Sequence, residues 1–276
     1  MTKISIIVPS FNQGKFLEDT FQSILSQNYA NTEIIVMDGG STDNSINIIK
    51  KYESHISYWQ SQKDNGQSDA INQGFAKATG DIVTWLNSDD VLLPGTLNKV
   101  NEYAIRYPST QWFLGNVLWM DKEGDIIRIG KVEKESVFWN RLHLFSNGGP
   151  TAFMRKQKLL EMGGLREDFH YMMDTELWHR YISNAVFFKR IPIYCWGLRI
   201  HEDAKMSGHN FANSQLADKS HPSWTQKERE KRFIQTTYLT SRTIIGNLWK
   251  YKRAIGVVIL SKLLDRKLLG NNYKDL

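Results

Sequence analysis

The stretch that decides the fold is ISIIVPSFN, residues 4–12, near the start of the chain. Its first five residues are mostly β-branched and lead into Pro9, a pattern typical of a buried strand that stops at a proline. Apolar residues then recur at helical spacing, at Leu17, Phe21, Ile24 and Leu25. A strand followed closely by an amphipathic helix predicts the first β–α unit of an α/β protein.

The same alternation continues to residue 86. Residues 33–37 (EIIVM), 56–60 and 82–86 are predicted strands, and helical periodicity separates them over 46–52 and 70–78. This order favours a mostly parallel central sheet with right-handed crossovers and flanking helices. Ligands of such sheets bind at the carboxyl ends of the strands. We therefore expect the functional residues in the loops that follow the strands, at 9–13, 38–43, 64–69 and 87–90.

The second half of the chain is less regular. We expect a helix after Pro94, a hairpin formed by 112–120 and 126–129, a short strand at 151–154 and a helix in the 170s. Residues 1–205 are predicted to form one α/β domain. A polar stretch, 206–223, is predicted to be a flexible loop, and 224–276 a basic amphipathic helical tail.

Composition is typical of a soluble globular protein. With 276 residues, of which 41% are hydrophobic, the chain can bury a substantial core. Its single cysteine, Cys195, excludes an internal disulfide and favours the cytoplasm. The sequence MTKISIIVPS lacks the long apolar region of a signal peptide. No apolar run approaches the roughly 18 residues of a membrane-spanning helix.

The positive charge is concentrated in the tail. Lys and Arg number 35 against 29 Asp and Glu, and between residues 242 and 267 seven basic residues stand against Asp265 alone. Apolar residues mark one face of a helix there, so the tail is predicted to bind an anionic membrane surface, peripherally and on the inner face of the cell membrane. A helix packed on the domain with a solvated basic face is the alternative. Because the tail accounts for most of the net charge, no nucleic-acid partner is predicted.

The stretch TWLNSDD, residues 84–90, begins as an apolar strand and ends in two adjacent acids. Adjacent carboxylates repel each other, and the strand before them is predicted to be buried. Either a bound cation compensates this charge or the acids serve as turn and helix-capping residues.

Four segments in this order resemble glycosyltransferase family 2, the inverting enzymes of the GT-A fold: ISIIVPSFNQGKFLEDTFQSILSQ, EIIVMDGGSTDNS, DNGQSDAINQGFAKATGDIVTWLNSDD and MMDTELWHRY. The resemblance covers roughly residues 3–205. It implies a Rossmann-like, mostly parallel sheet flanked by helices, with a C-terminal helical extension. Residues 1–100 would form the nucleotide-binding half and 101–205 the acceptor half.

The resemblance implies that the first two loops hold the nucleotide of a sugar nucleotide. Phe11 would stack on the base, and Asp38 would accept hydrogen bonds from it, unless Asp38 is only a strand-end turn acid. The family commonly has a second acid where this chain has Gly39. The remaining residues implied in this part of the site are Pro9, Ser10 and Asn12.

The third segment implies contacts to the rest of the donor. Asp64 and Asp69 flank the loop near the nucleotide, and Asp69 has the alternative role of a helix N-cap. Family members usually carry an Arg near the diphosphate where this chain has Ile71. Arg199 is the residue implied to offset that missing cation.

The stretch 84–90 matches the family's metal motif with one change, since Asn87 replaces the first acid. The resemblance implies that Asp89 and Asp90, with His201, bind Mn²⁺ or Mg²⁺, which prefer hard oxygen ligands. Asn87 and Ser88 would contact the donor, and an Asn87→Asp change would tighten metal binding. Helix capping by Asp90 and a satisfied surface His201 are the alternatives.

The fourth segment implies the catalytic group. Asp174 aligns with the general base that takes the proton of the acceptor hydroxyl; helix capping is its alternative. Glu176 is a weaker candidate, because it would face another side of the helix. Trp178 and Gly149 are implied to shape the sugar pocket, although a Trp in the core is the commoner outcome.

These features lead to one functional hypothesis and an alternative. The chain is predicted to be an inverting, metal-dependent transferase that moves a sugar from a nucleoside-diphosphate sugar to a hydroxyl of a glycan acceptor. The acceptor would be lipid-linked, in cell-surface polysaccharide or O-antigen biosynthesis. The alternative is a non-catalytic nucleotide-sugar or glycan-binding subunit of an assembly complex, because several positions depart from the family pattern.

Overall fold

A computed structural model describes residues 1–132, 152–169, 173–205 and 268–276. The described strands form a nine-stranded sheet in the order β3-β2-β1-β4-β8-β6-β9-β5, with β7 paired to β6. The strands are β1 (Ile4–Ser10), β2 (Thr32–Asp38), β3 (Tyr58–Ser61), β4 (Ile82–Trp85), β5 (Val91–Leu92), β6 (Trp112–Met120), β7 (Ile126–Gly130), β8 (Ala152–Arg155) and β9 (Lys189–Arg199). The helices are α1 (Leu17–Leu25), α2 (Ser45–Lys51), α3 (Gln67–Lys77), α4 (Thr96–Arg106), α6 (Lys156–Glu161) and α7 (Met173–Ser183), with 3₁₀ turns η1 (Glu53–His55) and η3 (Tyr273–Asp275).

The sheet has a parallel half and a mixed half. Strand β1 pairs in parallel with β2 and β4, and β2 pairs in parallel with β3, which confirms the predicted arrangement of the first four strands. In the other half β8 runs antiparallel to both β4 and β6, while β6 and β9 are parallel. The predicted β6–β7 hairpin is confirmed. The sequence pattern does not predict β9, because Pro192 and charged residues interrupt its apolar alternation.

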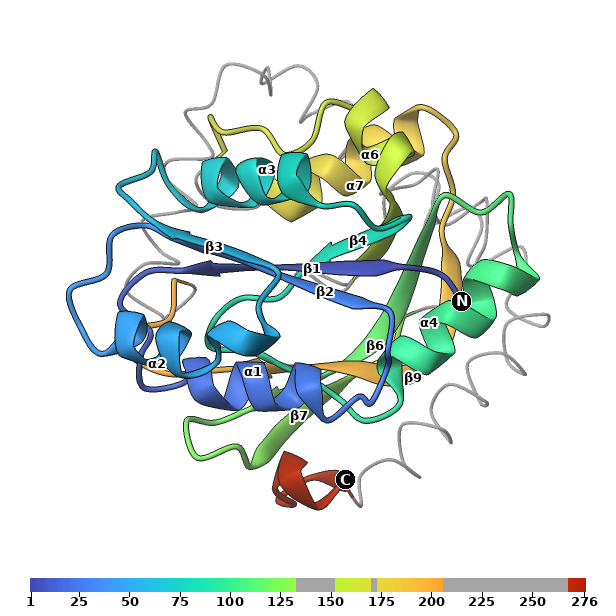
Figure 1. Ribbon diagram of the computed structural model, residues 1–276. Helices are drawn as coiled ribbons and strands as arrows, with labels where there is room; N and C mark the ends of the chain where they lie inside the picture. The colour runs from blue at the N-terminus through green and yellow to red at the C-terminus, as the bar shows by residue number, and fades with distance from the viewer. Residues whose placement is uncertain (133–151, 170–172, 206–267) are drawn as a thin grey trace, which may run out of the picture.

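Helices cover both faces of the sheet (Figure 1). On one face α1, α2 and α4 bury apolar side chains such as Phe21, Ile49 and Val100. On the other face α3, α6 and α7 contribute Phe75, Leu159 and Leu177. This three-layer order follows from the alternation of strand and amphipathic helix, since each helix buries one apolar stripe against the sheet.

Close packing of α3 on β1 depends on a glycine. A Cβ atom on Gly74 would lie 2.5 Å from a methyl carbon of Ile7, so a larger residue would push the helix off the strand. The start of α3 therefore stays near the carboxyl ends of β1 and β4. Because the four parallel strands point the same way, the loops after them share one edge of the sheet.

The opposite edge is held by a buried acid, Glu33. Its carboxylate accepts hydrogen bonds from the hydroxyls of Ser5 and Thr79, the backbone N–H of Thr79 and the ammonium of Lys3. Burial alone would raise the pKa of Glu33, but these donors outweigh it and lower the pKa to about 2. This edge is polar for structural reasons, so it does not compete with the other edge as a candidate site.

Several predictions fall on residues that the structure does not describe. Gly149, the loop 206–223 and residues 224–267 of the tail lie outside the described ranges, so the division into domain, loop and tail stays a prediction. The last nine residues are described and pack against the β6–β7 hairpin, where Ile126 and Asn271 share a backbone hydrogen bond. Among the described residues, no helix has the length and apolar character needed to cross a membrane.

Candidate active site at the carboxyl edge of the sheet

The loops after β1 and β2 are joined by hydrogen bonds. The backbone N–H of Asn12 donates to Ser41 Oγ, and Asn12 Oδ1 accepts from the N–H of Thr42, both at 2.8 Å. Asn12 has φ of 53°, a left-handed conformation that Asn tolerates better than most residues. This geometry leaves the ring of Phe11 60% exposed at the edge of the sheet. An exposed aromatic face on a fixed loop suits stacking with a planar ligand.

Asp38 is buried under its own loop. Its carboxylate accepts hydrogen bonds from the backbone N–H groups of Gly40 and Ser41 and from the hydroxyls of Ser41 and Ser61. Only 2% of the residue is exposed. Four donors use the lone pairs of the carboxylate, which favours the strand-end turn role, and contact of Asp38 with a base stays a prediction.

A second carboxylate occupies the place of the acid that the family pattern has at position 39. A Cβ atom on Gly39 would lie 2.8 Å from Asp64 Oδ2 and 3.4 Å from a ring carbon of Phe11. Asp64 is fixed by the backbone N–H of Gly66, which donates to its Oδ1. The glycine thus makes room for a carboxylate that comes from the loop after β3, beside the exposed ring.

The other residues predicted to bind the nucleotide are buried or hold the local structure. Pro9 and Ser10 are buried within β1, and Ser10 Oγ has no hydrogen-bond partner among the described residues. Asp69 accepts hydrogen bonds from Gln73 and from the backbone and side chain of Asn65. The bond from Gln73, then those from Asn65, lower the pKa of Asp69. Asp69 therefore holds the turn that leads into α3, inside the first helical turn rather than as its N-cap.

Asp89 and His201 form the centre of what we call the metal corner, residues 87–90 and 199–201. Asp89 Oδ2 and His201 Nε2 lie 3.1 Å apart. The imidazole is buried against the ring of Phe16, with 4.5 Å between ring centres. Its other nitrogen, Nδ1, has no partner among the described residues. The structure thus brings together two residues that the sequence separates by more than a hundred positions.

Asp90 is held by structural hydrogen bonds, and its role as a metal ligand stays a prediction. The residue is 4% exposed. Its carboxylate accepts hydrogen bonds from the backbone N–H of Arg199 and from the side-chain amide of Asn87, each at 2.9 Å. Burial, and then the charge of Asp89, raise the pKa of Asp90 well above its usual value. Asp90 is thus a structural acid that ties β9 to the end of β4.

Asn87 connects this corner to α3 and to the end of β9. Its Oδ1 accepts a hydrogen bond from Gln67, whose own Oε1 accepts one from Lys205. Burial lowers the pKa of the Lys205 ammonium to about 8. Ser88 is buried within the turn. Sequence inspection missed Gln67 and Lys205; the available signal was their place next to Asp69 and His201, in loops that end at this edge.

Asp174 lies at the start of α7, close enough to Lys205 for its charge to raise the pKa of the ammonium against the effect of burial. Its Oδ1 accepts a hydrogen bond from the backbone N–H of Thr175. Residue Met173 packs against α3, where its sulfur accepts a hydrogen bond from Ser68. The contacts of α3 with α7 and of Gln67 with Lys205 bring Asp174 to the same edge as the metal corner.

Two other predicted roles change. Glu176, the weaker candidate for the base, forms a two-bond ion pair with Arg180 and braces the helix. Trp178 is 1% exposed and stacks between Trp85 and Trp112 in the core. A ring with both faces covered by other rings cannot stack on a sugar, so the expectation of a pocket role is wrong and the core alternative holds.

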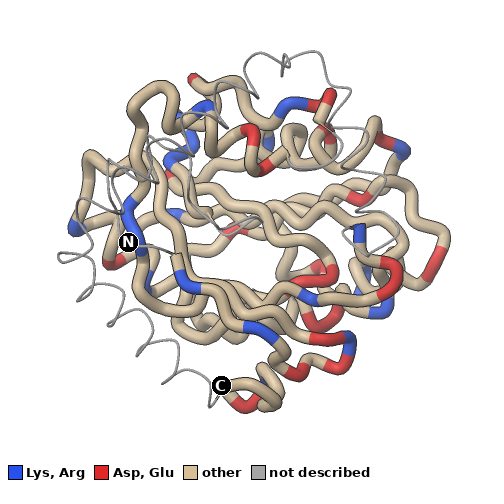
Figure 2. The backbone as a smooth tube through the Cα atoms, turned by 180° about the vertical axis from the view of Figure 1, so that it is seen from behind, with Lys and Arg blue, Asp and Glu red and all other residues tan. Residues whose placement is uncertain are grey.

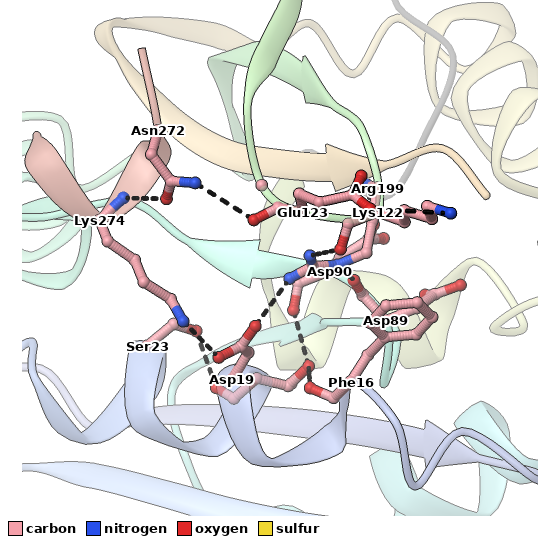
Figure 3. A network of polar contacts seen from close by, with 12 residues as sticks. Phe16, Asp19, Ser23, Asp89, Asp90, Lys122, Glu123, Arg199, Asn272 and Lys274 are labelled. Atoms are coloured by element: carbon pink, nitrogen blue, oxygen red, sulfur yellow. Dashed lines mark hydrogen bonds and ion pairs between the residues drawn. The ribbon is translucent and has the colours of Figure 1, made fainter.

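Arg199 is not available for a diphosphate either. Its guanidinium donates to the backbone oxygens of Asp89 and Lys122 and to the carboxylate of Asp19 (Figure 3). Its side chain is 1% exposed. Ile71, where the family has a cation, is fully buried under the sheet. The finding on Arg199 changes the expected electrostatics: it does not offset the cation that is missing at Ile71.

Seen from behind, acidic segments gather on the side of the molecule away from the N-terminus, where these loops lie (Figure 2). An anionic ligand would meet repulsion there unless a cation accompanied it. Two ligands at about 2.1 Å from one octahedral cation lie about 3 Å apart, and the Asp89–His201 separation of 3.1 Å fits that geometry. No group of three or more potential metal ligands occurs within the described part of the chain. Asp89 and His201 are the described pair that could hold such a cation.

A family model described as glycosyl transferase family 2 matches residues 5–163, more than half of the chain. The chain belongs to this family. Members similar to it include a GalNAc(5)-diNAcBac-PP-undecaprenol β-1,3-glucosyltransferase of Campylobacter jejuni, 32% identical over 204 residues, which are 70% of this chain and 65% of that protein. The chain thus spans less than two thirds of that relative's length.

One further relative and one solved structure extend the comparison. The poly(ribitol-phosphate) β-N-acetylglucosaminyltransferase TarP of Staphylococcus aureus is 35% identical over 109 residues, 38% of this chain and 33% of that protein. The structure of S. aureus TarS residues 1–349 in complex with UDP-GlcNAc superposes with a TM-score of 0.62 at 18% identity, covering 78% of this chain and 65% of that one. This likeness establishes the fold as GT-A-like, an α/β architecture with a mostly parallel central sheet.

Proposed function

We propose that this protein is an inverting glycosyltransferase that transfers a sugar from a nucleoside-diphosphate sugar to a hydroxyl of a glycan. The observation that carries the proposal is the meeting of three separate parts at one edge: the Asp89–His201 pair, the link from Asn87 through Gln67 to Lys205, and Asp174 beside that lysine. Membership of the family supports it. The UDP-GlcNAc complex of TarS makes UDP-sugars the first donors to test.

The base of the nucleotide would lie against Phe11 with Asp64 beside it. The exposed ring offers a stacking face, and the carboxylate can accept hydrogen bonds from ring N–H groups of a base. Asp38 would contribute indirectly, by fixing the loop after β2, since its carboxylate is occupied by backbone and hydroxyl donors. This arrangement needs no acid at position 39.

Asp89 and His201 would hold a divalent cation, Mn²⁺ or Mg²⁺, whose chemistry is to neutralise charge on the leaving diphosphate. Lys205 is the described cation best placed to assist, because it is held by Gln67 next to Asn87. It would replace the positive charge that the family has at position 71. Asp174 would take the proton of the attacking hydroxyl, which is the one acid–base step that such a transfer requires.

The acceptor is proposed to be a lipid-linked glycan in cell-surface polysaccharide or O-antigen assembly, at the inner face of the membrane. The Campylobacter relative, a β-1,3-glucosyltransferase named for an undecaprenol-linked glycan, supports this class. The basic segment 242–267 supports contact with anionic lipid. Replacing its seven Lys and Arg with Gln should abolish binding to phosphatidylglycerol vesicles at about 0.1 M salt, while the docked residues 268–276 stay intact. Unchanged partitioning would refute the membrane contact.

The test of the main proposal combines binding and turnover. A panel of sugar nucleotides is screened by thermal shift with and without Mn²⁺, because a ligand that binds only the folded state raises the melting temperature by mass action. The best donor is then assayed for hydrolysis and transfer. We expect turnover that Asp174→Asn lowers by about 10²-fold or more while donor binding is kept. Tight donor binding without any turnover in the wild type would instead favour the non-catalytic binding subunit.

A further inference from the structure

The last described segment, residues 268–276, is anchored on the β6–β7 hairpin. Gly270 N–H donates to the carbonyl oxygen of Ile126, Ile126 N–H to that of Asn271, and Tyr273 N–H to that of Gly124. The side chain of Asn272 donates to the carbonyl oxygen of Glu123 and to the carboxylate of Asp125. Backbone pairing of this kind fixes the segment in one register, so its side chains have defined positions.

Tyr273 inserts behind the metal corner. Its ring is 9% exposed and belongs to the apolar cluster of Val91, Leu118 and Met120, and Val91 directly follows Asp90 in the chain. The ring occupies the space beside Gly124, where a Cβ atom would lie 2.8 Å from two of its carbons. This glycine has φ of 98°, so both its conformation and the ring exclude a larger residue.

A series of ion pairs and hydrogen bonds connects the same segment to the backbone of Asp89. Lys274 Nζ lies 3.0 Å from Asp19 Oδ1, and Asp19 Oδ2 accepts from the guanidinium of Arg199 at 3.1 Å (Figure 3). That guanidinium lies between the rings of Phe16 and Tyr273, at 4.8 and 5.9 Å from their centres. Its Nε donates to the backbone oxygen of Asp89 at 3.0 Å. Arg199 therefore joins α1, the hairpin turn and the docked segment to the residue that faces His201.

From these contacts we infer that residues 268–276 act as a brace that positions Asp89 through Arg199, with Tyr273 and Lys274 as its positioning residues. The inference rests on the proposed function, since it assigns the braced carboxylate to the donor's cation. The carboxylate of Asp89 is the proposed ligand, and Arg199 fixes only the position of the Asp89 backbone. Loosening the brace should therefore weaken cation binding more than it lowers the rate with the site saturated.

The experiment compares Tyr273→Ala and Lys274→Ala with Tyr273→Phe and Lys51→Ala in the full chain. Lys51 is a matched control. It forms an exposed ion pair with Glu18, which lies on α1 beside Asp19, and it does not touch Arg199. Mn²⁺ affinity is measured in the presence of UDP by calorimetry. We expect Tyr273→Ala to weaken it about tenfold, Lys274→Ala about threefold, Tyr273→Phe, which loses the hydroxyl's hydrogen bond with Arg199, by less than Tyr273→Ala, and Lys51→Ala less than twofold. In the transfer assay the apparent Mn²⁺ constant should change more than kcat.

Hydrogen exchange separates failure of this inference from failure of the proposed function. The amide of Arg199, which donates to Asp90, should exchange faster in Tyr273→Ala than in the wild type, with or without substrate. That result would support the brace even if the chain transfers no sugar. If Tyr273→Ala lowers the melting temperature but leaves both this exchange rate and Mn²⁺ affinity unchanged, residues 268–276 only stabilise the fold and the inference is overturned.

Discussion

The base side of the site and the metal corner lie on one edge of the same sheet but are built in different ways. On the base side, Asp38 holds residues two and three positions ahead, Asp64 holds Gly66, and the longer contacts span only 23 to 30 positions. In the metal corner, Asp89 meets His201, 112 positions away, and Arg199 meets Asp19, 180 positions away. The first is a set of turns, whereas the second exists only once the whole domain has folded.

This difference has a physical consequence for mutations. The loop around Asn12 on the base side can adjust locally, since its hydrogen bonds are exposed and water can replace them. The metal corner is buried and shares donors and acceptors among four elements, so a missing partner leaves an unpaired polar group. We therefore expect larger and more coupled effects in the corner, and four substitutions measure the contrast.

The largest effect is expected for Asp89→Asn. An amide is a far weaker ligand than a carboxylate for a divalent cation, so activity should fall by about 10³-fold, equivalent to several kcal/mol of lost transition-state stabilisation. Stability should change little, because Asn can still contact His201. Steady-state kinetics across a Mn²⁺ series and a melting curve measure the two quantities. Asp81→Asn is the control, an exposed acid at the start of the same strand segment; comparable losses in both variants would contradict the ligand role.

Asp90→Ala comes next and should act mainly on stability. It removes the acceptor of the Arg199 N–H and of the Asn87 amide, both in a buried setting, at a cost of about 3 kcal/mol in the free energy of unfolding. Denaturant unfolding provides the measurement. If Asp90→Ala loses activity and keeps its stability, then Asp90 acts mainly as a functional ligand and its structural role is secondary.

Neighbouring residues of one motif thus have different surroundings, and this shows how much the sequence could predict. The first four strands, the β6–β7 hairpin, the edge and the meeting of Asp89 with His201 were predicted, because they follow from local periodicity and from the family motif. Burial of Asp90, saturation of Arg199 and the Trp178 stack were not predicted. Each depends on partners far away in sequence. From sequence alone, an Asp, an Arg and a Trp at these positions could equally be an exposed ligand, a phosphate-binding cation and a sugar-stacking ring.

The third substitution, Asn87→Asp, tests whether the family motif or the local hydrogen bonds determine the effect of residue 87 on metal binding. The motif alone implies tighter metal binding. In the structure the new carboxylate would replace an amide that donates to Asp90 at 2.9 Å, and two acceptors would face each other in a buried space. We expect a loss of about 2 kcal/mol in stability and weaker metal binding.

A double variant makes this prediction specific. In Asn87→Asp with Asp90→Asn, the amide at 90 can donate to the carboxylate at 87, still accept from Arg199, and leave the carboxylate at 87 to accept from Gln67. Most of the lost stability should return, which a double-mutant cycle measures directly. Tighter Mn²⁺ binding by the single variant would instead restore the motif-based view of position 87.

The smallest effect is expected on the base side, for Asp64→Asn. The amide can keep the hydrogen bond from Gly66 through its oxygen, so the fold should be unaffected. An amide oxygen accepts a hydrogen bond less strongly than a carboxylate, and donor KM should rise about tenfold with kcat nearly constant.

Gly39→Ala probes the same carboxylate from the other side, because its methyl group would lie 2.8 Å from Asp64 Oδ2 and displace it. If Asp64 contacts the base, both variants raise donor KM and their effects are not additive. An unchanged KM in both would show that the acid missing at position 39 has no substitute here, and that Phe11 alone holds the base.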